Sequence, residues 1–326
     1  MSDPAVERWQ PGTTREMLTL RARLMTCTRN FFAERQVLEV DTPVCVNAGV
    51  TDVNLASAEA RIGTRRLFLH TSPEYAMKRL LAAGSGDIFQ LCHVVRSDER
   101  SALHNPEFAL LEWYRLGFSL ERLVNEVGEL LNAYSYAAGR PPRELETLRY
   151  RDAFLGALQI DPLCAEEPVL RSLALQHGLD RHSATTLQRD ALLDFLMAVV
   201  VGPTLGRNTW LAITHYPASQ AALAQLDTDD PRVALRFEIY ADGIELANGF
   251  VELADADEQA RRFERDIAER ALRGAPAVAA DRRLLAALRS GLPECAGVAV
   301  GFDRALMIAS GARDIAQVMP FTLEHA

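Results

Sequence analysis

The chain has 326 residues, of which 48% are hydrophobic and 24% are charged, a composition typical of a globular protein. No stretch approaches the roughly 20 consecutive apolar residues that a membrane-spanning helix needs, and the first residues lack the basic and apolar run of a secretory signal, so we expect a cytoplasmic protein without a membrane partner. The formal net charge of −9 argues against a large tRNA-binding surface, because nucleic-acid-binding proteins usually carry a basic surface.

The cysteines are scattered along the chain and include no Cys-x-x-Cys pair: Cys27, Cys45, Cys92, Cys164 and Cys295. An odd number at irregular spacing suits neither a disulfide framework nor a zinc site, so we predict reduced thiols.

The N-terminal part combines helices with short strands. Residues 15–36 predict an amphipathic helix, because their apolar side chains recur at steps of three and four. Residues 37–40 and 67–71 are short strand candidates. A second helix should open directly afterwards, with Ser72 as its N-cap and Pro73 at its first helical position.

Two longer strands, 88–96 and 108–116, are predicted next. The charged connection between them, 97–107, has eleven residues, and loops of this length are often functional. A helix is expected over 119–138. The region 140–208 contains several prolines and short helical patterns, and we interpret it as a helical insertion without a recognisable chemical motif.

The C-terminal part returns to strands at 209–215 and 236–253. The second of these should fold into a hairpin at Asp242 and Gly243, a dipeptide typical of two-residue turns. Residues 297–307 predict a strand that runs into a helix. Strands joined by hairpins, with helices outside, predict one α/β (α+β) domain with a mainly antiparallel sheet.

Chemistry-bearing side chains gather on one face of the strand 108–116. Phe108, Glu112 and Tyr114 share a face because side chains of a strand alternate. Together with the charged loop that precedes the strand, these residue types suit a polar ligand. The alternative is an ordinary half-buried strand in which Glu112 forms a salt bridge.

Three glutamates follow one another at seven-residue intervals around the predicted hairpin: Glu238, Glu245 and Glu252. The turn should place Glu245 opposite Tyr240 and Glu238 opposite Ala247, so that the first two glutamates lie diagonally on one face. Two such carboxylates repel each other unless a cation intervenes, and Mg²⁺ shared with nucleotide phosphates is the natural candidate. The alternative is a solvated hairpin.

A third signal is the segment from Gly301 to Arg304 at a strand-to-helix junction. Glycine permits a close ligand approach, and a guanidinium suits a phosphate or the face of a purine. The alternative is a simple helix N-terminus capped by Asp303.

In this order the segments resemble the class II aminoacyl-tRNA synthetases in their lysine-specific form. The similarity extends over 15–325 and is weakest across 140–208. The segments that carry it are 37–43, which resembles the dimer-interface motif 1, then 71–75 (substrate loop), 89–96 with 104–114 (motif 2), 236–238 with 243–253 (metal and amino-acid segment) and 297–307 (motif 3). The resemblance implies a class II catalytic domain over 1–326 and a homodimer.

Within this group the chain resembles the paralogous ligases that attach (R)-β-lysine to a lysine of elongation factor P. Lysyl-tRNA synthetases carry an N-terminal oligonucleotide-binding barrel, whereas here the motif 1 helix begins near Thr14 and leaves no room for one. Segments 217–225 and 230–234 also look like the ligases. Ala299 stands where lysyl-tRNA synthetases typically have glycine, and its methyl group would reshape the amino-acid pocket.

The resemblance implies ATP and Mg²⁺ as cofactors and lysine or (R)-β-lysine as substrate. Arg96 and Arg304 would be catalytic, through the α-phosphate and the adenine or γ-phosphate respectively. The metal would bind to Glu238 and Glu245. The implied ATP-binding residues are Arg96, Ser97, Asp98, His104, Asn105, Phe108, Glu245, Leu246, Gly301 and Arg304, and the implied substrate-binding residues are Ser72, Pro73, Glu74, Tyr114, Asn248, Glu252 and Ala299.

Two positions depart from the family pattern. A glutamate is expected where Asp98 stands, and an arginine is expected near Ala102. Three alternatives to an elongation factor P ligase stay open at this point: a free-standing enzyme that charges tRNA, an activating enzyme with another protein or a small amine as acceptor, and a non-catalytic regulatory paralogue.

Overall fold

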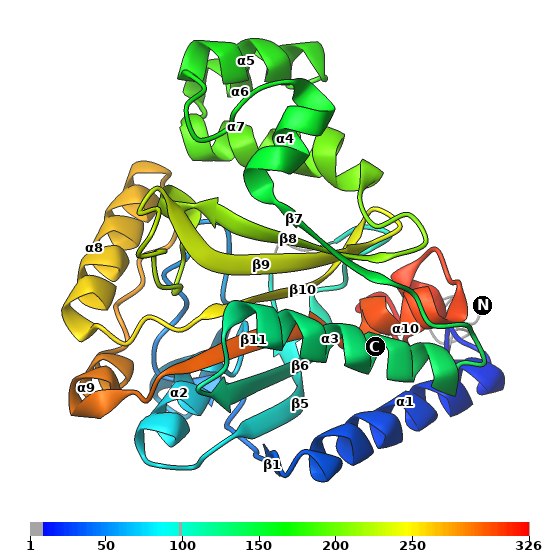
Figure 1. Cartoon of the computed structure of the whole chain (residues 1–326). Helices are drawn as coiled ribbons and strands as arrows, with labels where there is room; N and C mark the ends of the chain where they lie inside the picture. The colour runs from blue at the N-terminus through cyan, green and yellow to red at the C-terminus, as the bar shows by residue number, and fades with distance from the viewer. Residues whose placement is uncertain (1–8, 98–99, 326) are drawn as a thin grey trace, which may run out of the picture. The chain divides into compact units, whose positions relative to one another are not determined.

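The computed structural model describes residues 9–97 and 100–325, and its chain forms two compact units (Figure 1). The first unit contains Met1–Gly117, Glu129–Pro142 and Ala254–Ala326, and the second contains Phe118–Gly128 and Arg143–Leu253. The helix α3 (Leu120–Ala137), predicted over 119–138, has residues in both units. Whether the units make up one catalytic domain stays a prediction.

The first unit contains four strands of the main sheet. β5 (Ile88–Val95) pairs in antiparallel fashion with β6 (Glu107–Leu116), and β6 pairs in the same way with β11 (Cys295–Gly301). At the edge, β1 (Leu38–Glu39) runs parallel to β5. The prediction of a mainly antiparallel sheet with helices around it is therefore confirmed, and the parallel pair at its edge was not anticipated.

A small antiparallel sheet accompanies these strands. Its order is β2 (Cys45–Val46), β4 (Arg65–Leu69) and β3 (Glu59–Ile62). The strand predicted at 67–71 is β4, displaced by two residues at each end.

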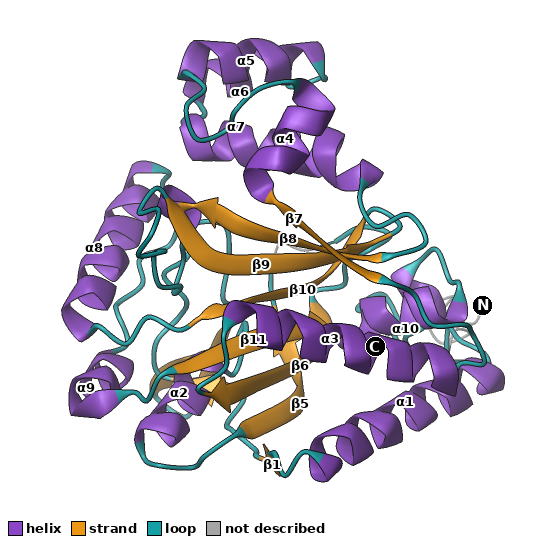
Figure 2. Cartoon of the chain, in the orientation of Figure 1, coloured by secondary structure: helices purple, strands orange, loops and turns teal. Residues whose placement is uncertain are grey.

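The helices of the first unit contribute buried side chains to its core. α1 (Arg15–Glu34) confirms the predicted amphipathic helix: it begins after Thr14, whose hydroxyl accepts a hydrogen bond from the amide of Met17 at 3.2 Å. Its buried Phe32 stacks on Phe89 of β5, with 4.4 Å between ring centroids. The other helices are α2 (Glu74–Ala82), α8 (Ala256–Leu272), α9 (Arg282–Gly291) and α10 (Phe302–Ser310), and Figure 2 shows them in purple.

The second unit contains the other four strands. β9 (Val233–Ala241) and β10 (Ile244–Val251) form the predicted hairpin around Asp242 and Gly243. β8 (Trp210–Pro217) pairs with β9 in antiparallel fashion, and β7 (Leu145–Arg149) runs parallel to β8. We did not predict β7, because only helical patterns were assigned to its region.

Helices make up most of the region predicted as a helical insertion. They are α4 (Tyr150–Leu158), α5 (Glu167–Gln176), α6 (Arg181–Thr186), α7 (Arg189–Leu196) and a π-helical turn, η1 (Met197–Val201). A buried cluster joins them to β8 and β9: the Tyr150 ring lies 4.7 Å from that of Tyr216, and Ile213 and Tyr240 belong to the same cluster. This apolar contact anchors the helices on β8 and on β9, the strand that bears Glu238.

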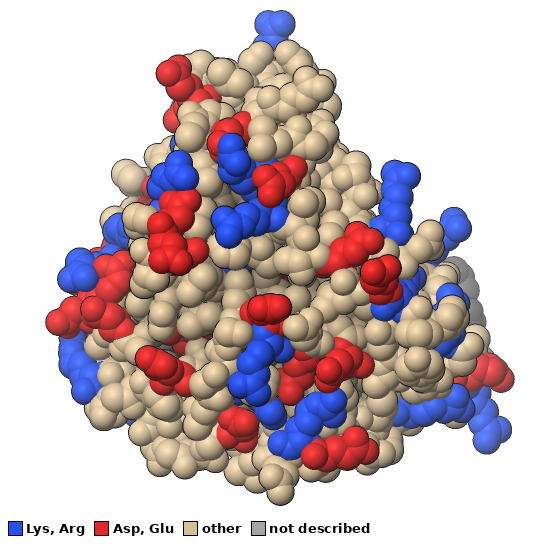
Figure 3. Space-filling model, in the orientation of Figure 1, with Lys and Arg blue, Asp and Glu red and all other residues tan. Residues whose placement is uncertain are grey.

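Charged side chains of both signs are interspersed on the face drawn in Figure 3. In the described part of the chain, no helix is long and apolar enough to cross a membrane.

Candidate functional site

One face of the first unit carries large polar side chains on one strand and very small ones on the next. Across the β6–β11 pair, Glu112 lies opposite Ala299 and Tyr114 lies opposite Gly297. Opposite residues of a strand pair present their side chains on the same face. The alanine and the glycine therefore leave space beside the carboxyl group of Glu112 and the ring of Tyr114.

The Glu112 carboxyl group is buried, with an exposed fraction of 2%, and is held by two hydroxyl donors. The Ser72 hydroxyl donates to one of its oxygens at 2.6 Å, and the Tyr114 hydroxyl donates to the other at 2.7 Å. Burial, with the nearby Glu74 carboxylate as second cause, raises the pKa of Glu112 from 4.5 to about 7. An ammonium ion at this place would favour the ionised carboxylate, so the group suits a cationic ligand.

The start of α2 differs from the predicted cap. Pro73, not Ser72, occupies the N-cap position, because α2 begins at Glu74. The Ser72 hydroxyl still accepts a hydrogen bond from the amide of Glu74 at 3.0 Å while it donates to Glu112. One hydroxyl group therefore links the substrate-loop segment to the buried carboxyl group of β6.

Arg96 lies beside Phe108, and both residues are predicted to bind ATP. Its guanidinium carbon is 5.1 Å from the centroid of the Phe108 ring, and its Nε donates to the carbonyl of Thr71 at 3.3 Å. The cation is thus placed next to both an aromatic face and the segment that leads into Ser72 and Glu74.

Arg304 contacts the loop between β5 and β6. Its Nε donates to the carbonyl of Leu103 at 3.2 Å, and its guanidinium contacts the ring nitrogen Nε2 of His104. Asn105 is held by its own bonds, since its amide group donates to the carbonyl of Glu107 at 2.6 Å and accepts from the amide of Leu323 at 3.2 Å.

The remaining predicted positions of this loop are only partly described. Ser97 lies in a turn after β5, where its amide donates to the carbonyl of Ala56 at 3.1 Å. Asp98, predicted to bind ATP, lies outside the described residues.

Asp303 is not the cap of α10. Gly301 occupies the N-cap position, and no side chain bonds to the cap. The Asp303 carboxylate is buried, accepts from the amide of Ala109 in β6 at 2.7 Å, and forms an ion pair with Arg21 of α1. The neighbouring Arg304 is thereby attached to a helix start that is fixed to β6.

In the second unit, a β-bulge changes the predicted register of the glutamate hairpin. Glu245 lies opposite Tyr240, as predicted, but Glu238 lies opposite Asn248 and not Ala247. The register shifts at Leu246, which is the extra residue of the bulge. Because of this extra residue, Asn248 shares the face of Glu238 and Glu245, and without it Asn248 would point to the other face.

Glu238 is buried and already has two donors. Arg236 donates to one carboxylate oxygen at 2.6 Å, and the Tyr240 hydroxyl donates to the other at 2.7 Å. Burial, and then the charge of Glu238, raises the pKa of Tyr240 far above its usual value, so this hydroxyl stays protonated. Glu245 is half-buried on the same face, and Glu252, just beyond β10, is 1% exposed.

Two carboxylates on one face fit the usual way in which proteins hold Mg²⁺, with one or two carboxylates and the phosphates of a nucleotide. Among the residues that the structure describes, no group of three or more histidine, cysteine or acidic side chains is placed to hold a metal ion. A metal site at Glu238 and Glu245 therefore stays a prediction.

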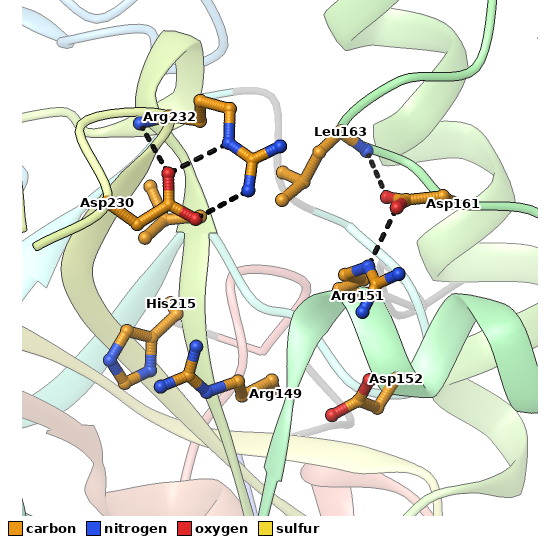
Figure 4. Close-up of a pocket in the computed structure, with 9 residues that line it drawn as sticks. Arg149, Arg151, Asp152, Asp161, Leu163, His215, Asp230 and Arg232 are labelled. Carbon is orange, nitrogen blue, oxygen red and sulfur yellow. Dashed lines mark hydrogen bonds and ion pairs between the residues drawn. The ribbon is translucent and has the colours of Figure 1, made fainter.

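A separate pocket of about 310 Å³ in the second unit is a different kind of site (Figure 4). Its cations are largely matched by carboxylates: Arg232 binds Asp230 through two contacts of 2.8 Å, and Arg151 binds Asp161 at 2.7 Å. None of the predicted site residues lines it; its lining is Arg149, Arg151, Asp152, Asp161, Leu163, His215, Asp230, Arg232 and Val233. We therefore do not assign the predicted chemistry to it.

The comparison with known proteins agrees with this geometry. Residues 8–325 match the family described as tRNA synthetases class II (D, K and N). The chain belongs to this family. It is 48% identical to the elongation factor P–(R)-β-lysine ligase of Pasteurella multocida, over 98% of this chain and 99% of the relative. It is also 48% identical to the ligase of the same name from Salmonella arizonae and 47% identical to that from Enterobacter sp., in both cases over the full length of each chain.

Membership of the class II synthetases implies that the protein uses ATP. The roles of the individual residues stay predictions.

Sequence reasoning missed two members of the first unit's polar group. Glu112 was noticed on the face of its strand but received no substrate role, although a carboxylate two residues from a tyrosine on a strand is a usable signal. Lys78 was not noticed at all. Its only signal is its place four residues after Glu74, which aligns the two on one side of a helix.

Proposed function

We propose that this protein activates (R)-β-lysine, or lysine, with ATP as an aminoacyl-adenylate and transfers the acyl group to a lysine side chain of elongation factor P. The observation that carries the proposal is the buried carboxyl group of Glu112, held by Ser72 and Tyr114 next to Glu74, on a chain that aligns over its length with ligases of this name. A buried acidic group selects a cationic amino acid, because an uncompensated buried charge is costly.

Glu74 would bind the substrate's ammonium group near the carboxylate that is activated. Tyr114, which is hydrogen-bonded to Glu112, would bind the ammonium group at the far end of the substrate together with Glu252. Ser72 and Pro73 would form the loop beside it, and Asn248 and Ala299 would complete the pocket's wall and floor. The support is that Tyr114 and Glu112 are buried and lie opposite the small residues Gly297 and Ala299, which leave space beside them.

Adenylate formation requires that the substrate carboxylate and the α-phosphate meet while negative charge grows on the phosphate. Arg96 would neutralise that charge, Phe108 would stack on adenine, and Arg304 would contact the nucleotide from the other side. The remaining nucleotide contacts would come from Ser97, Asp98, His104, Asn105, Leu246 and Gly301. Such catalysis relies on positioning and charge stabilisation and needs no side-chain nucleophile.

Mg²⁺ would be held by Glu238 and Glu245 together with the nucleotide, and when bound it would neutralise the triphosphate. Arg236 and Tyr240 fix the orientation of the Glu238 carboxylate, so one ligand is already oriented in the protein itself.

We also propose that the protein is a cytoplasmic homodimer. The motif 1 segment supports a dimer, because Leu38 and Val44 within or beside it are 56% and 44% exposed and form apolar surface that a partner could cover. Light scattering coupled to gel filtration would measure the mass directly, and a monomer at micromolar concentration would contradict this part.

The experiment that tests the activity has two stages. ATP–pyrophosphate exchange with (R)-β-lysine and with lysine detects adenylate formation, and a transfer assay then offers labelled adenylate to elongation factor P or to tRNA. We expect exchange with a lysine-like amino acid and label only on elongation factor P. Label on tRNA alone would refute the acceptor, and absence of exchange would refute the activity.

A further inference from the structure

Lys78 is the single lysine of this chain. The sequence contains 35 basic residues of the lysine and arginine types, and at every position but this one the residue is arginine. Its side chain is 1% exposed, and lysine is among the residues least often fully buried in proteins. A lone lysine in such a place, in a chain that otherwise uses arginine, calls for a specific role.

Lys78 forms an ion pair with Glu74 along α2. The ammonium group donates to the Glu74 carboxylate at 2.7 Å, one helical turn apart, and the Glu74 side chain is 17% exposed. The Glu74 amide is meanwhile bound to the Ser72 hydroxyl, which also holds Glu112. Glu74 is thus bound by a buried cation while part of its side chain stays accessible.

A compact ammonium group suits this position better than a guanidinium. Lysine presents a point charge with three donors, whereas arginine has a planar group with five donors, all of which would need partners in a buried place. The Glu74 carboxylate lies close enough to Glu112 for its charge to raise the pKa of Glu112. A buried positive charge next to Glu74 offsets this repulsion.

We propose that Lys78 is a positioning residue that orients the Glu74 carboxylate toward the ammonium group of the amino-acid substrate. Lys78 does not touch the substrate in this arrangement and acts through Glu74. The inference rests on the proposed function for the identity of the substrate.

Other titratable groups interact with this pair and must be considered in any pH experiment. Glu112 of β6 interacts with both Glu74 and Lys78, and Tyr75 of α2 interacts with Glu74, with Asp52 and Asp266 also acting on Tyr75. Tyr114 of β6 and Cys92 of β5 interact with Glu112 and so act on the pair only through it. Lys78 lowers the pKa of Glu112, opposing burial and Glu74. Removing Lys78 should therefore shift the pH dependence of amino-acid binding to higher pH.

The first arm of the test uses Lys78→Met, which keeps the length of the side chain and removes its charge. In the exchange assay we expect KM for the amino acid to rise ~10- to 100-fold and KM for ATP to stay within ~3-fold. We also expect amino-acid binding to weaken at a higher pH than in the wild-type protein when the pH is lowered. In a Glu74→Gln background the same substitution should add little, because residues that act through one another are not additive. Equal rises of both KM values, or additive effects of the two substitutions, would overturn the proposal.

The second arm needs no substrate and so separates this inference from the proposed function. Because the chain has one lysine, labelling with lysine that carries ¹⁵N at Nζ gives a single ammonium signal in the NMR spectrum. Glu74→Gln should shift that signal and speed its hydrogen exchange, whereas Glu59→Gln, an exposed carboxylate paired with Arg66, should not. A signal that does not respond to Glu74→Gln would overturn the inference even if wild-type protein were fully active, and a responding signal would support the pairing even if exchange with lysine failed.

Discussion

The ion pair between Asp303 and Arg21 offers a sharp test of how the strand-to-helix junction is held. Asp303 is 1% exposed and Arg21 12% exposed, and the same carboxylate accepts the Ala109 amide at 2.7 Å. Asp303→Asn keeps the shape and one acceptor oxygen but leaves the guanidinium without its counter-charge. Breaking a buried pair in this way typically costs about 3–5 kcal/mol, and the partial exposure of Arg21 places the expected loss near the lower end, about 3 kcal/mol.

Urea unfolding followed by circular dichroism would measure this loss as a lower midpoint at unchanged slope. The matched control is Asp161→Asn, which breaks a more exposed pair with Arg151 and should cost below about 1 kcal/mol. Arg21→Met combined with Asp303→Asn should be less destabilising than the sum of the single changes, because the double variant leaves no buried charge unpaired. If Asp303→Asn costs no more than the control, the pair does not stabilise the junction and the reasoning is wrong.

Three further predictions concern stability and activity. Folding raises the pKa of Glu112 from 4.5 to about 7, so between these pH values the folded protein keeps a proton that the unfolded chain has lost. The free energy of unfolding should therefore fall as pH rises through this window, by up to about 3 kcal/mol from this group. Glu112→Gln should remove that fall when unfolding is followed from about pH 4.5 to about pH 7.5. Gly206→Ala should lower the melting temperature strongly, since φ is +65° and an added Cβ would lie 2.4 Å from the carbonyl oxygen of Tyr240; a variant as stable as wild type would contradict the backbone geometry. Glu245→Gln should reduce pyrophosphate exchange by ~100-fold or more and raise the Mg²⁺ concentration for half-maximal rate, and an unchanged Mg²⁺ titration would remove Glu245 from the metal site.

Local patterns in the sequence predicted most of the elements. Apolar spacing located α1, and the Asp242–Gly243 dipeptide located the hairpin of β9 and β10. These succeed because helical and strand periodicity, and the positive φ that such turns require, depend on neighbouring residues.

Long-range pairing could not be predicted in the same way. β7 forms only because β8, far along the chain, lies parallel to it. The bulge at Leu246 depends on how β10 meets β9, and the burial of Lys78 depends on what covers α2. None of these has a local sequence signal strong enough to identify it, because strand partners and burial are set by the packing of distant segments.

The sequence by itself determined which residue types were available and which shared a strand face, so the glutamates, the arginines and the antiparallel framework could all be identified in advance. Only the tertiary structure decided their electrostatic state. The pKa of Glu112 rises because folding buries it beside Glu74, and Asn248 joins the face of Glu238 because one extra residue shifts the strand. The reason is physical: a charge's energy depends on the solvent and the partners around it, and these exist only once distant segments have come together.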